Sequence, residues 1–277
     1  MIQNRYEKGE TQDWNRIRSA FPFLEEKGHV ISMAGAGGKT TLMYFLAEHC
    51  AKRGIRVLIS TTTHIRKPMN KKCARTAADP NFGQEGSVLS FEREAVWIED
   101  GTSLDLLWEM KKIPVLGREA PDGKLRMPEQ DILKAAVKRA DLVLLEADGA
   151  RQMPCKAPNQ TEPVLLDESD IVIAVLGIDA VGKTLSEACF RAELAAERLH
   201  TDLDHRLETS DLAELLLAEW GTRKGVGGRD YYIVLNKCYS GGPGSAKELK
   251  NMLLQSGACS VVMTDFTKRG EKMQCIL

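Results

Sequence analysis

The sequence predicts an α/β fold in which helices cover both faces of a mostly parallel β-sheet. Short and nearly continuous apolar runs of strand length recur along the chain, and stretches with apolar residues at helical spacing lie between several of them. A strand that is apolar at almost every position is typical of a parallel sheet buried on both faces. Strands that alternate with helices are typical of a layered α/β domain.

The apolar runs give the expected strands, and the first of them leads into a glycine-rich loop. Their β-branched and aliphatic residues favour extended backbone over helix at these short lengths. The expected strands cover residues 29–33, 56–60, 142–145, 171–176, 231–235 and 260–263.

Helical spacing of apolar residues predicts the helices. Leu42, Leu46 and Cys50 share one face, and Gly54 suits the end of that helix because glycine accepts positive φ. The other helices are expected from a packing segment with Trp14, Ile17, Phe21, Phe23 and Leu24, and then from Ile132, Leu133, Ala136 and Val137, from Phe190, Leu194 and Leu199, from Leu212, Leu215, Leu216 and Trp220, and from Leu249, Met252 and Leu253 behind a capping box of Ser245 and Glu248.

We interpret residues 1–277 as a single domain with an inserted elaboration at residues 64–128. Residues 87–98 and 113–116 fit short extra strands inside this elaboration, and a hairpin on the main sheet is the arrangement that we expect for them. The segment is punctuated by prolines, namely Pro68, Pro80, Pro114, Pro121 and Pro128.

The composition is that of a soluble globular protein without a general affinity for polyanions. Of the 277 residues, 43% are hydrophobic, and 38 basic against 39 acidic residues give a net charge of −1. This balance argues against nucleic acid or an anionic membrane surface as a partner. The longest apolar run, residues 171–176, is far shorter than the ~20 residues of a membrane helix. Scattered cysteines without a CxxC pair, and an N-terminus without an apolar signal core, favour a reduced, cytoplasmic protein.

A glycine-rich loop between a strand and a helix is the strongest functional motif. Residues 33–41 read Met-Ala-Gly-Ala-Gly-Gly-Lys-Thr-Thr. Glycines let backbone N–H groups converge on phosphate oxygens, and the helix N-terminus attracts negative charge, so the motif predicts a phosphate-binding loop (P-loop) and a three-layer P-loop NTPase-like fold. Met33 stands where the usual pattern has glycine, and an incidental glycine-rich turn is the alternative. The residues expected at the nucleotide are Gly35, Ala36, Gly37, Gly38, Lys39, Thr40 and Thr41, with Lys39 on the β- and γ-phosphates and Thr40 on Mg²⁺.

An apolar run that ends in two carboxylates resembles a Walker-B strand. Glu146 and Asp148 are two residues apart, so they point to the same side of an extended chain. We expect Asp148 to hold Mg²⁺ opposite Thr40 and Glu146 to orient the attacking water, with both as candidate metal ligands. The pattern alone leaves open which carboxylate has which role. A solvated acidic strand end is the alternative.

Three weaker motifs surround this core. Residues 60–64, Ser-Thr-Thr-Thr-His, lie at the end of the second expected strand, and Thr62 and Thr63 are candidates for ligand contact, although strand propensity explains them equally well. Residues 177–184 match the P-loop pattern letter for letter, but the acidic strand should follow the P-loop in the chain, which favours Lys39 over Lys183. Asn236 and Lys237 resemble the base-recognition element of GTPases, but its aspartate is replaced by tyrosine, so GTP is not favoured over ATP.

Over about residues 29–240 the chain contains a set of segments that belong together, namely residues 34–41, 61–63 with Pro68, 146–151, Pro154, 156–158, 162–164, 177–182 and 191–193. Together they resemble the YqeC family of selenium-dependent hydroxylase accessory proteins. The resemblance implies a role in the maturation of selenium-dependent molybdenum hydroxylases without fixing the reaction. It also implies that Arg151 and Lys156 bind an anionic substrate or transition state, and that Glu162 orients them. Cys155 is either an ordinary cysteine or a thiol that carries selenide or persulfide.

The sequence therefore predicts a Mg²⁺-dependent NTPase that uses ATP or another nucleoside triphosphate. A molybdenum hydroxylase or its cofactor is the expected partner, and the pattern does not indicate an oligomeric state. Two alternatives stay open, namely a non-hydrolytic carrier or insertion chaperone for a molybdopterin-type cofactor, and a small-molecule kinase or ligase. The expected catalytic residues are Lys39, Glu146, Asp148, Arg151 and Lys156.

Overall fold

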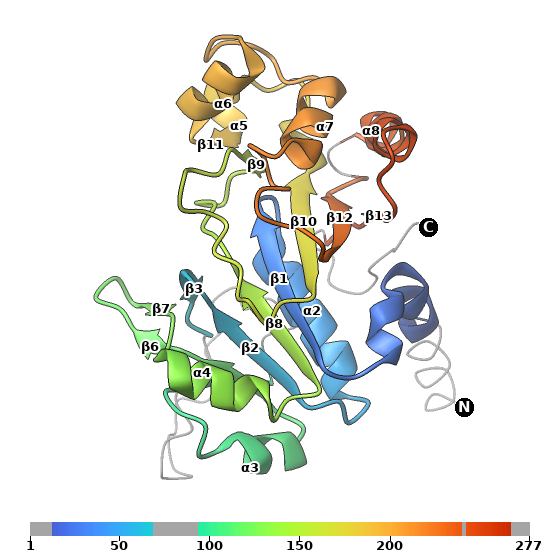
Figure 1. Ribbon diagram of the computed structural model, residues 1–277. Helices are drawn as coiled ribbons and strands as arrows, with labels where there is room; N and C mark the ends of the chain where they lie inside the picture. Colours follow the sequence, from blue (N-terminus) through green and yellow to red (C-terminus); the bar gives the residue numbers. More distant parts are fainter. Residues whose placement is uncertain (1–12, 69–93, 240–241, 267–277) are drawn as a thin grey trace, which may run out of the picture.

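A parallel β-sheet forms the centre of the protein in a computed structural model that describes residues 13–68, 94–239 and 242–266 (Figure 1). Within these residues the sheet has eight strands in the order β13-β12-β10-β1-β8-β2-β5-β4, and all neighbours run parallel. The α/β prediction is confirmed, and each expected strand is present. The strands are β1 (His29–Gly35), β2 (Val57–Thr61), β4 (Ala95–Ile98), β5 (Ile113–Leu116), β8 (Leu142–Glu146), β10 (Ile171–Gly177), β12 (Asp230–Asn236) and β13 (Val261–Met263).

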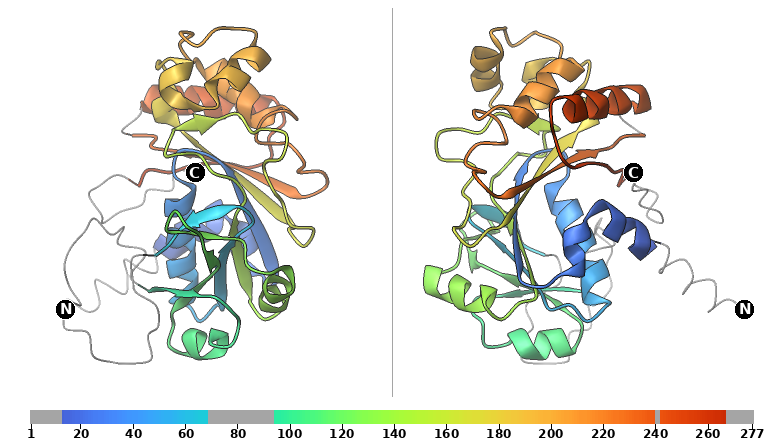
Figure 2. Two further views of the ribbon diagram at one scale, coloured as in Figure 1. Left: turned by 90° about the vertical axis from the view of Figure 1, so that its left-hand side faces the viewer. Right: turned by 45° about the vertical axis from the view of Figure 1, so that its right-hand side comes forward.

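Helices cover both faces of this sheet, so the predicted three-layer arrangement is also confirmed. Alternate residues of β10 show the two faces, because Ile173 and Val175 pack with α2, whereas Ala174 and Leu176 pack with α7 and α8. A third cluster lies under α3 and α4, and the left view of Figure 2 shows α2 and α4 on opposite sides of the sheet. The helices are α2 (Lys39–Ala51), α3 (Leu104–Glu109), α4 (Gln130–Val137), α5 (Leu185–Ala188), α6 (Ala192–Leu199), α7 (Thr209–Leu217) and α8 (Pro243–Gln255), with 3₁₀ turns η1 (Pro22–Glu25) and η3 (Ile178–Ala180) and a helical segment at residues 13–20.

The predicted hairpin in residues 64–128 is wrong. β4 and β5 pair in parallel and extend the main sheet, because α3 lies between them and buries Leu104 and Leu107 against it. Residues 87–93 of the predicted extra strand lie outside the described residues. A small antiparallel sheet is formed in the same segment by β3 (His64–Arg66), β7 (Lys124–Arg126) and β6 (Arg118–Glu119).

Two helix starts also differ from prediction. Phe190 belongs to a short strand, β11 (Cys189–Phe190), which pairs with β9 (Cys155–Lys156), and α6 begins only after it. The expected capping box of Ser245 does not form, because α8 begins at Pro243, whose fixed φ suits the first turn of a helix. Both errors arise because apolar spacing locates a helix better than it locates its end.

The register of the sheet brings several strand ends to one edge. Met33 of β1 lies beside Glu146 of β8, and Thr61 of β2 lies on the other side of Glu146. In an open parallel sheet the carboxyl ends of the strands border the ligand crevice. The glycine-rich loop, the acidic pair and the threonines therefore meet at this edge.

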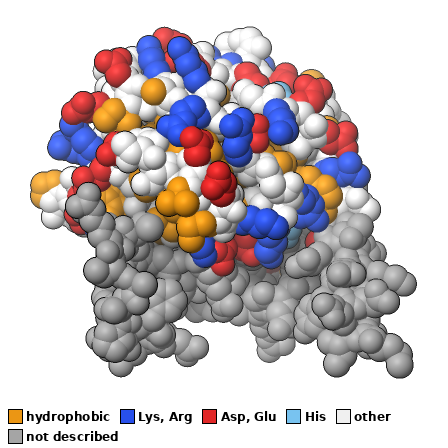
Figure 3. All heavy atoms as spheres, turned by 90° about the horizontal axis from the view of Figure 1, so that it is seen from below, with side chains coloured by type: hydrophobic (Ala, Val, Ile, Leu, Met, Phe, Trp, Pro, Cys, Tyr) orange, Lys and Arg blue, Asp and Glu red, His pale blue; other side chains and the backbone are white. Residues whose placement is uncertain are grey.

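The surface and the helices add two observations on the partner predictions. On the face drawn in Figure 3, acidic and basic side chains are interspersed, which agrees with the near-zero net charge. In the part of the chain that the structure describes, no helix has the length and the apolar character that crossing a bilayer requires.

The chain passes very close to β10 as it leaves β1. Gly37 has a φ of +75°, and a Cβ placed on it would lie 2.6 Å from Gly177 Cα and 2.7 Å from Pro154 O. The Gly37 N–H also donates to Met153 O at 3.0 Å. Only glycine fits this approach, because both the backbone angle and the lack of space exclude a side chain.

We predict that Gly37→Ala destabilises the protein more than Gly54→Ala does. Gly54 has nearly the same φ, +77°, but nothing lies within 4 Å of its added Cβ. Gly54→Ala should therefore cost only the backbone strain of about 1–2 kcal/mol, and Gly37→Ala an additional ~1–3 kcal/mol of overpacking. Urea unfolding of both variants measures the difference, and equal losses would show that the loop does not press against β10.

Candidate functional site

The glycine-rich loop is fixed between the sheet and the start of α2. Asn236, the last residue of β12, donates from Nδ2 to Gly37 O at 2.8 Å. α2 begins at Lys39 directly after the loop, and no side chain caps its N-terminus. The N–H groups of the first turn of a helix have no partner within the helix, so this end of α2 is suited to an anion.

Three of the predicted nucleotide contacts use their amides inside the protein. The Gly35 N–H donates to Asp148 Oδ2 at 3.1 Å, and Ala36 and Gly37 donate to the carbonyls of Val175 and Met153 at 2.8 and 3.0 Å. In this structure they give the loop its shape. The donors that remain for phosphate are those of residues 38–41 at the start of α2.

Lys39 and Asp148 lie together in the interior. Lys39 Nζ is 2.9 Å from Asp148 Oδ1 and also donates to Gly35 O, and the two side chains are only 4% and 1% exposed. The pair is an ion pair without good hydrogen-bond alignment, since Asp148 Oδ1 has no hydrogen-bond partner. A buried ammonium that is held by one carboxylate can exchange it for another anion without being left unpaired.

Thr40 lies on the other acidic residue. Its Oγ1 donates to Glu146 Oε2 at 3.0 Å. The sequence placed Asp148 opposite Thr40, so the structure differs here: Glu146 ends β8 beside Met33, whereas Asp148 has turned to Gly35 and Lys39. Burial raises the pKa of Glu146, although Lys39 and Thr40 oppose this. A cation close to such a buried carboxylate would stabilise its ionised form.

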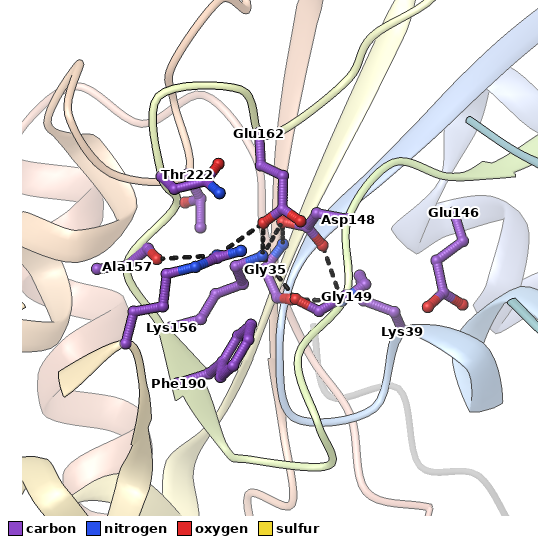
Figure 4. A network of polar contacts seen from close by, with 12 residues as sticks. Gly35, Lys39, Glu146, Asp148, Gly149, Lys156, Ala157, Glu162, Phe190 and Thr222 are labelled. Atoms are coloured by element: carbon purple, nitrogen blue, oxygen red, sulfur yellow. Dashed lines mark hydrogen bonds and ion pairs between the residues drawn. The ribbon is translucent and has the colours of Figure 1, made fainter. Parts of the chain in front are cut away.

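A second lysine holds the far side of Asp148 (Figure 4). Lys156 Nζ lies 3.0 Å from Asp148 Oδ2 and 2.7 Å from Glu162 Oε2, and it donates to Gly149 O at 2.6 Å. Its side chain is fully buried. Lys156 is predicted from sequence to bind substrate, but three protein oxygens occupy its ammonium. Its role here is to position Asp148 and the segment that follows it.

Glu162 extends the network to α6. Arg191, which precedes α6, donates to Glu162 Oε2 at 2.7 Å. Burial tends to raise the pKa of Glu162, but the hydrogen bonds from Arg191 and Lys156 outweigh it and lower the pKa overall. Glu162 therefore stays ionised between two cations, as the sequence-based role of orienting them requires.

Arg151 has a different environment from Lys156. Its side chain is exposed, and its guanidinium lies 5.2 Å from the ring centroid of Phe190. Arg191 and Lys156 lie 4.5 and 5.6 Å from the same ring. Phe190 was not identified as a site residue from sequence, because its spacing placed it on the stripe of a helix. The signal that could have found it is its position directly before Arg191 in the family-like segment.

The threonines after β2 have separate roles. Thr62 Oγ1 donates to Val164 O at 2.6 Å, so its hydroxyl is used in the fold. Thr61, the last residue of β2, donates to Glu146 O at 2.9 Å and ties β2 to β8. Thr63 Oγ1 is buried and has no hydrogen-bond partner. Of the two candidates, Thr63 therefore has the hydroxyl that a ligand could still use.

The second P-loop-like motif has another structure. Thr184 caps α5 in a capping box with Glu187, and α5 is only four residues long. Lys183 pairs with Asp179 at 3.7 Å, and Lys237 pairs with the same carboxylate at 2.8 Å. A short capped helix leaves few amides for phosphate, which agrees with the preference for Lys39.

Cys155 has the properties of a structural thiol. It is buried and faces Cys189 across the β9–β11 pair. A hydrogen bond with Cys189 and burial together raise the pKa of Cys155 well above its usual value. Reactive and carrier thiols need a lowered pKa, so this environment opposes a carrier role.

The residues present fit a Mg²⁺–nucleotide. The uncapped start of α2 offers donors for phosphate, the oxygens of Thr40 and Glu146 are the type that Mg²⁺ prefers, and Thr63 offers an unused hydroxyl. In the described residues no group of three or more His, Cys, Asp or Glu side chains forms a metal cage. Mg²⁺ in nucleotide sites needs only one or two protein ligands, because phosphates and waters supply the others.

We predict that Glu146→Gln stabilises the protein in the absence of metal and nucleotide. Because its folded pKa is raised, Glu146 keeps its proton to higher pH in the folded than in the unfolded chain, so the wild type loses stability as pH rises through the folded pKa. The variant lacks this loss. Its Tm should exceed that of the wild type by about 2–4 °C at pH 8, a shift that corresponds to ~1 kcal/mol. The difference should narrow at pH 5, and a variant less stable than wild type at pH 8 would contradict the prediction.

We also predict that Lys156→Met is far more damaging than Arg151→Gln. Removing Lys156 leaves two carboxylates without their shared buried cation, which typically costs about 3–5 kcal/mol. Arg151 is exposed and contacts only a ring face, so its loss should cost ~1 kcal/mol or less. Urea denaturation compares the two, and similar small losses would mean that Lys156 does not hold the network together.

Comparisons with known proteins agree with the resemblance seen in the sequence. A model of the family described as "YqeC protein" matches residues 31–193. An Escherichia coli (strain K12) protein described as "Uncharacterized protein YqeC" is 34% identical over 206 residues, which is 73% of this chain and 73% of that protein. The glycine-rich loop, Glu146 and the ion pairs up to Arg191 all lie in the region that the family model matches. The chain belongs to the YqeC family.

Proposed function

We propose that the protein is a Mg²⁺-dependent nucleoside triphosphatase, with ATP as its nucleotide, that acts in the maturation of selenium-dependent molybdenum hydroxylases. The observation that carries this proposal is the meeting of Lys39, Thr40 and Glu146 at the uncapped start of α2. The pathway is taken from the resemblance to the YqeC family, whereas the reaction is argued from this geometry.

Phosphate binding would rest on α2 and Lys39. The helix N-terminus provides aligned N–H donors and the positive end of the helix dipole. Lys39 is the first residue of α2, and its ion pair with Asp148 could be exchanged for one with phosphate oxygens. Asp148 would keep Lys156 and the Gly35 N–H as partners, so it would not be left unpaired.

Thr40 and Glu146 are the residues that would hold the metal. Their oxygens already lie 3.0 Å apart, and the raised pKa of Glu146 reflects a buried carboxylate that lacks a sufficient cation. A Mg²⁺ ion held by these two residues would neutralise charge on the phosphates and so favour phosphoryl transfer. With Glu146 as the metal ligand, the two carboxylates exchange the roles that the sequence suggested, in which Asp148 held the metal and Glu146 oriented the water.

Asp148 then becomes the candidate for positioning the attacking water. Its Oδ1 has no hydrogen-bond partner and would lose its ion pair when Lys39 turns to phosphate. A buried carboxylate oxygen in that position can accept a hydrogen bond from water and fix its orientation. Lys156 and the Gly35 N–H would keep the carboxylate in place through its other oxygen.

Two further functions remain outcomes of the test. A carrier of a molybdopterin-type cofactor would bind nucleotide-like phosphate without turnover, and a small-molecule kinase or ligase would transfer the phosphoryl group to another acceptor. The Thr40–Glu146 pair favours the hydrolase over the carrier, because phosphate binding alone does not require a buried carboxylate beside the P-loop hydroxyl.

We predict that Lys39→Ala weakens ATP binding by about 10–100-fold, the loss expected for a hydrogen bond between charged groups. Lys183→Ala is the matched control, because Lys183 belongs to the letter-perfect motif but pairs only with Asp179. Its ATP affinity should stay within about twofold of wild type. Calorimetric titration in the presence of Mg²⁺ measures both. The assignment of the P-loop to residues 35–41 is wrong if Lys183→Ala gives the larger loss.

We predict, for the same proteins, Mg²⁺-dependent phosphate release that Thr40→Ala and Glu146→Gln each lower by about 10²–10³-fold, as for other groups that stabilise transition-state charge. Release of radiolabelled phosphate from γ-labelled ATP measures this. Tight ATP binding without release, with candidate substrates supplied, would favour the carrier. A labelled small-molecule product would favour the kinase or ligase.

A further inference from the structure

We infer that a second anion site lies beside the P-loop, formed by Arg151 and Arg191 around the ring of Phe190, and that it takes a tetrahedral oxyanion of a second substrate. The oxyanion is either free or carried as a phosphate monoester. The inference rests on the proposed function where it calls the oxyanion a second substrate beside the nucleotide. The site itself is argued from residues outside the P-loop.

The first argument is the excess of positive charge. In the described network, the three cations Lys39, Lys156 and Arg191 share two carboxylates, and Arg151 lies beside them at the ring of Phe190. Asp148 serves Lys39 and Lys156, and Glu162 serves Lys156 and Arg191. Arg151 has no carboxylate partner among the described residues, so the surplus charge lies at the exposed end of the network.

The second argument is that both guanidinium groups lie at the same aromatic ring. Arg191 is held by Glu162 and the Ala157 carbonyl, and Phe190 presents its ring to both guanidinium groups, at 4.5 Å for Arg191 and 5.2 Å for Arg151. A contact with a ring face uses no N–H donor, so it leaves the donors of Arg151 available to an oxyanion. The ring therefore brings the two arginines together without using their N–H groups.

The third argument is the backbone that places them. Arg151 and Arg191 both have left-handed backbone, with φ of +46° and +64°, and Gln152 beside Arg151 has +63°. Such conformations are uncommon for residues other than glycine, and each costs free energy that the fold must offset. The chain is anchored directly after Arg151 and Gln152, where the Met153 and Pro154 carbonyls accept hydrogen bonds from the N–H groups of Gly37 and Gly177. The strain brings Arg151 to the ring that Arg191 also contacts.

The fourth argument is the link to the P-loop. A continuous series of ion pairs leads from Arg191 through Glu162, Lys156 and Asp148 to Lys39, at 2.7, 2.7, 3.0 and 2.9 Å (Figure 4). The Met153 carbonyl beside Arg151 meets the Gly37 N–H of the glycine-rich loop. A second anion at Arg151 would therefore lie next to a segment that contacts the phosphate-binding loop, which is where an acceptor or a reaction partner of the nucleotide is needed.

The test compares oxyanion binding among variants that all lack Lys39, so that the P-loop lysine contributes to none of them. Orthophosphate and phenyl phosphate are titrated by calorimetry into Lys39→Ala and into the double variant Lys39→Ala, Arg151→Gln, with correct folding checked by circular dichroism. The control is Arg198→Gln in the same background, because Arg198 is exposed on α6 and the change in charge is the same. A second measurement is a crystal soaked in tungstate, whose anomalous signal locates a tetrahedral oxyanion even if a variant misfolds.

The Arg151 change is expected to weaken binding of at least one probe tenfold or more, the Arg198 change to leave it within twofold, and tungstate to lie within hydrogen-bond distance of Arg151. The stronger probe shows whether the oxyanion is free or esterified. The inference would be overturned if the Arg151 and Arg198 changes weakened probe binding equally. It would also be overturned if Lys39→Ala bound neither probe, or if tungstate lay at the P-loop alone. Failure of ATP to bind would remove the proposed function but leave this result intact, so the two failures can be told apart.

Discussion

Asp148 is shared by two buried ammonium groups, and the arrangement of the whole site depends on this sharing. One of its oxygens faces Lys39 of the P-loop, and the other faces Lys156 and the Gly35 N–H. Buried charges are tolerated only when they are paired and hydrogen-bonded. The carboxylate therefore holds the end of β8, the start of α2 and the segment after Gly149 in one place. A displacement of any one of these three elements would disturb the ion pairs that hold the other two.

The same interior contains a group that weakens the fold. Glu146 is buried beside Thr40, and burial raises its pKa, so it is an acid whose surroundings disfavour its charge. Glu162 is the opposite case, because its two cations lower its pKa. Natural proteins accept such locally unfavourable groups where function needs them. The contrast separates two kinds of residue in the network. Glu162 and Lys156 stabilise the framework, whereas Glu146 is the buried acid that our proposal assigns to the metal.

Local patterns in the sequence predicted the fold and the outline of the site, because strand runs, helical spacing and the glycine-rich loop are properties of neighbouring residues. They did not predict which acid meets Thr40, since that depends on how far Asp148 turns after β8 ends. The burial of Lys156 and the position of Phe190 depend on the β9–β11 pair, which joins segments far apart in sequence. The parallel pairing of β4 and β5 was missed because a short helix between them was not recognised.

The two glycine-lysine motifs differ in the structural features that suit a motif to phosphate. Residues 177–184 match the usual letters, yet the Thr184 backbone N–H donates to Glu187 Oε2 in a capping box, and the helix that follows has four residues. Residues 33–41 lack the first glycine, yet they open a helix of thirteen residues whose N-terminus no side chain caps. Unpaired backbone N–H groups and a nearby cation favour anion binding, and the sequence motif alone determines neither of them. Met33 is tolerated because it is still part of β1 and packs in the core under α2, whereas the turn itself is made by Gly35 and Gly37.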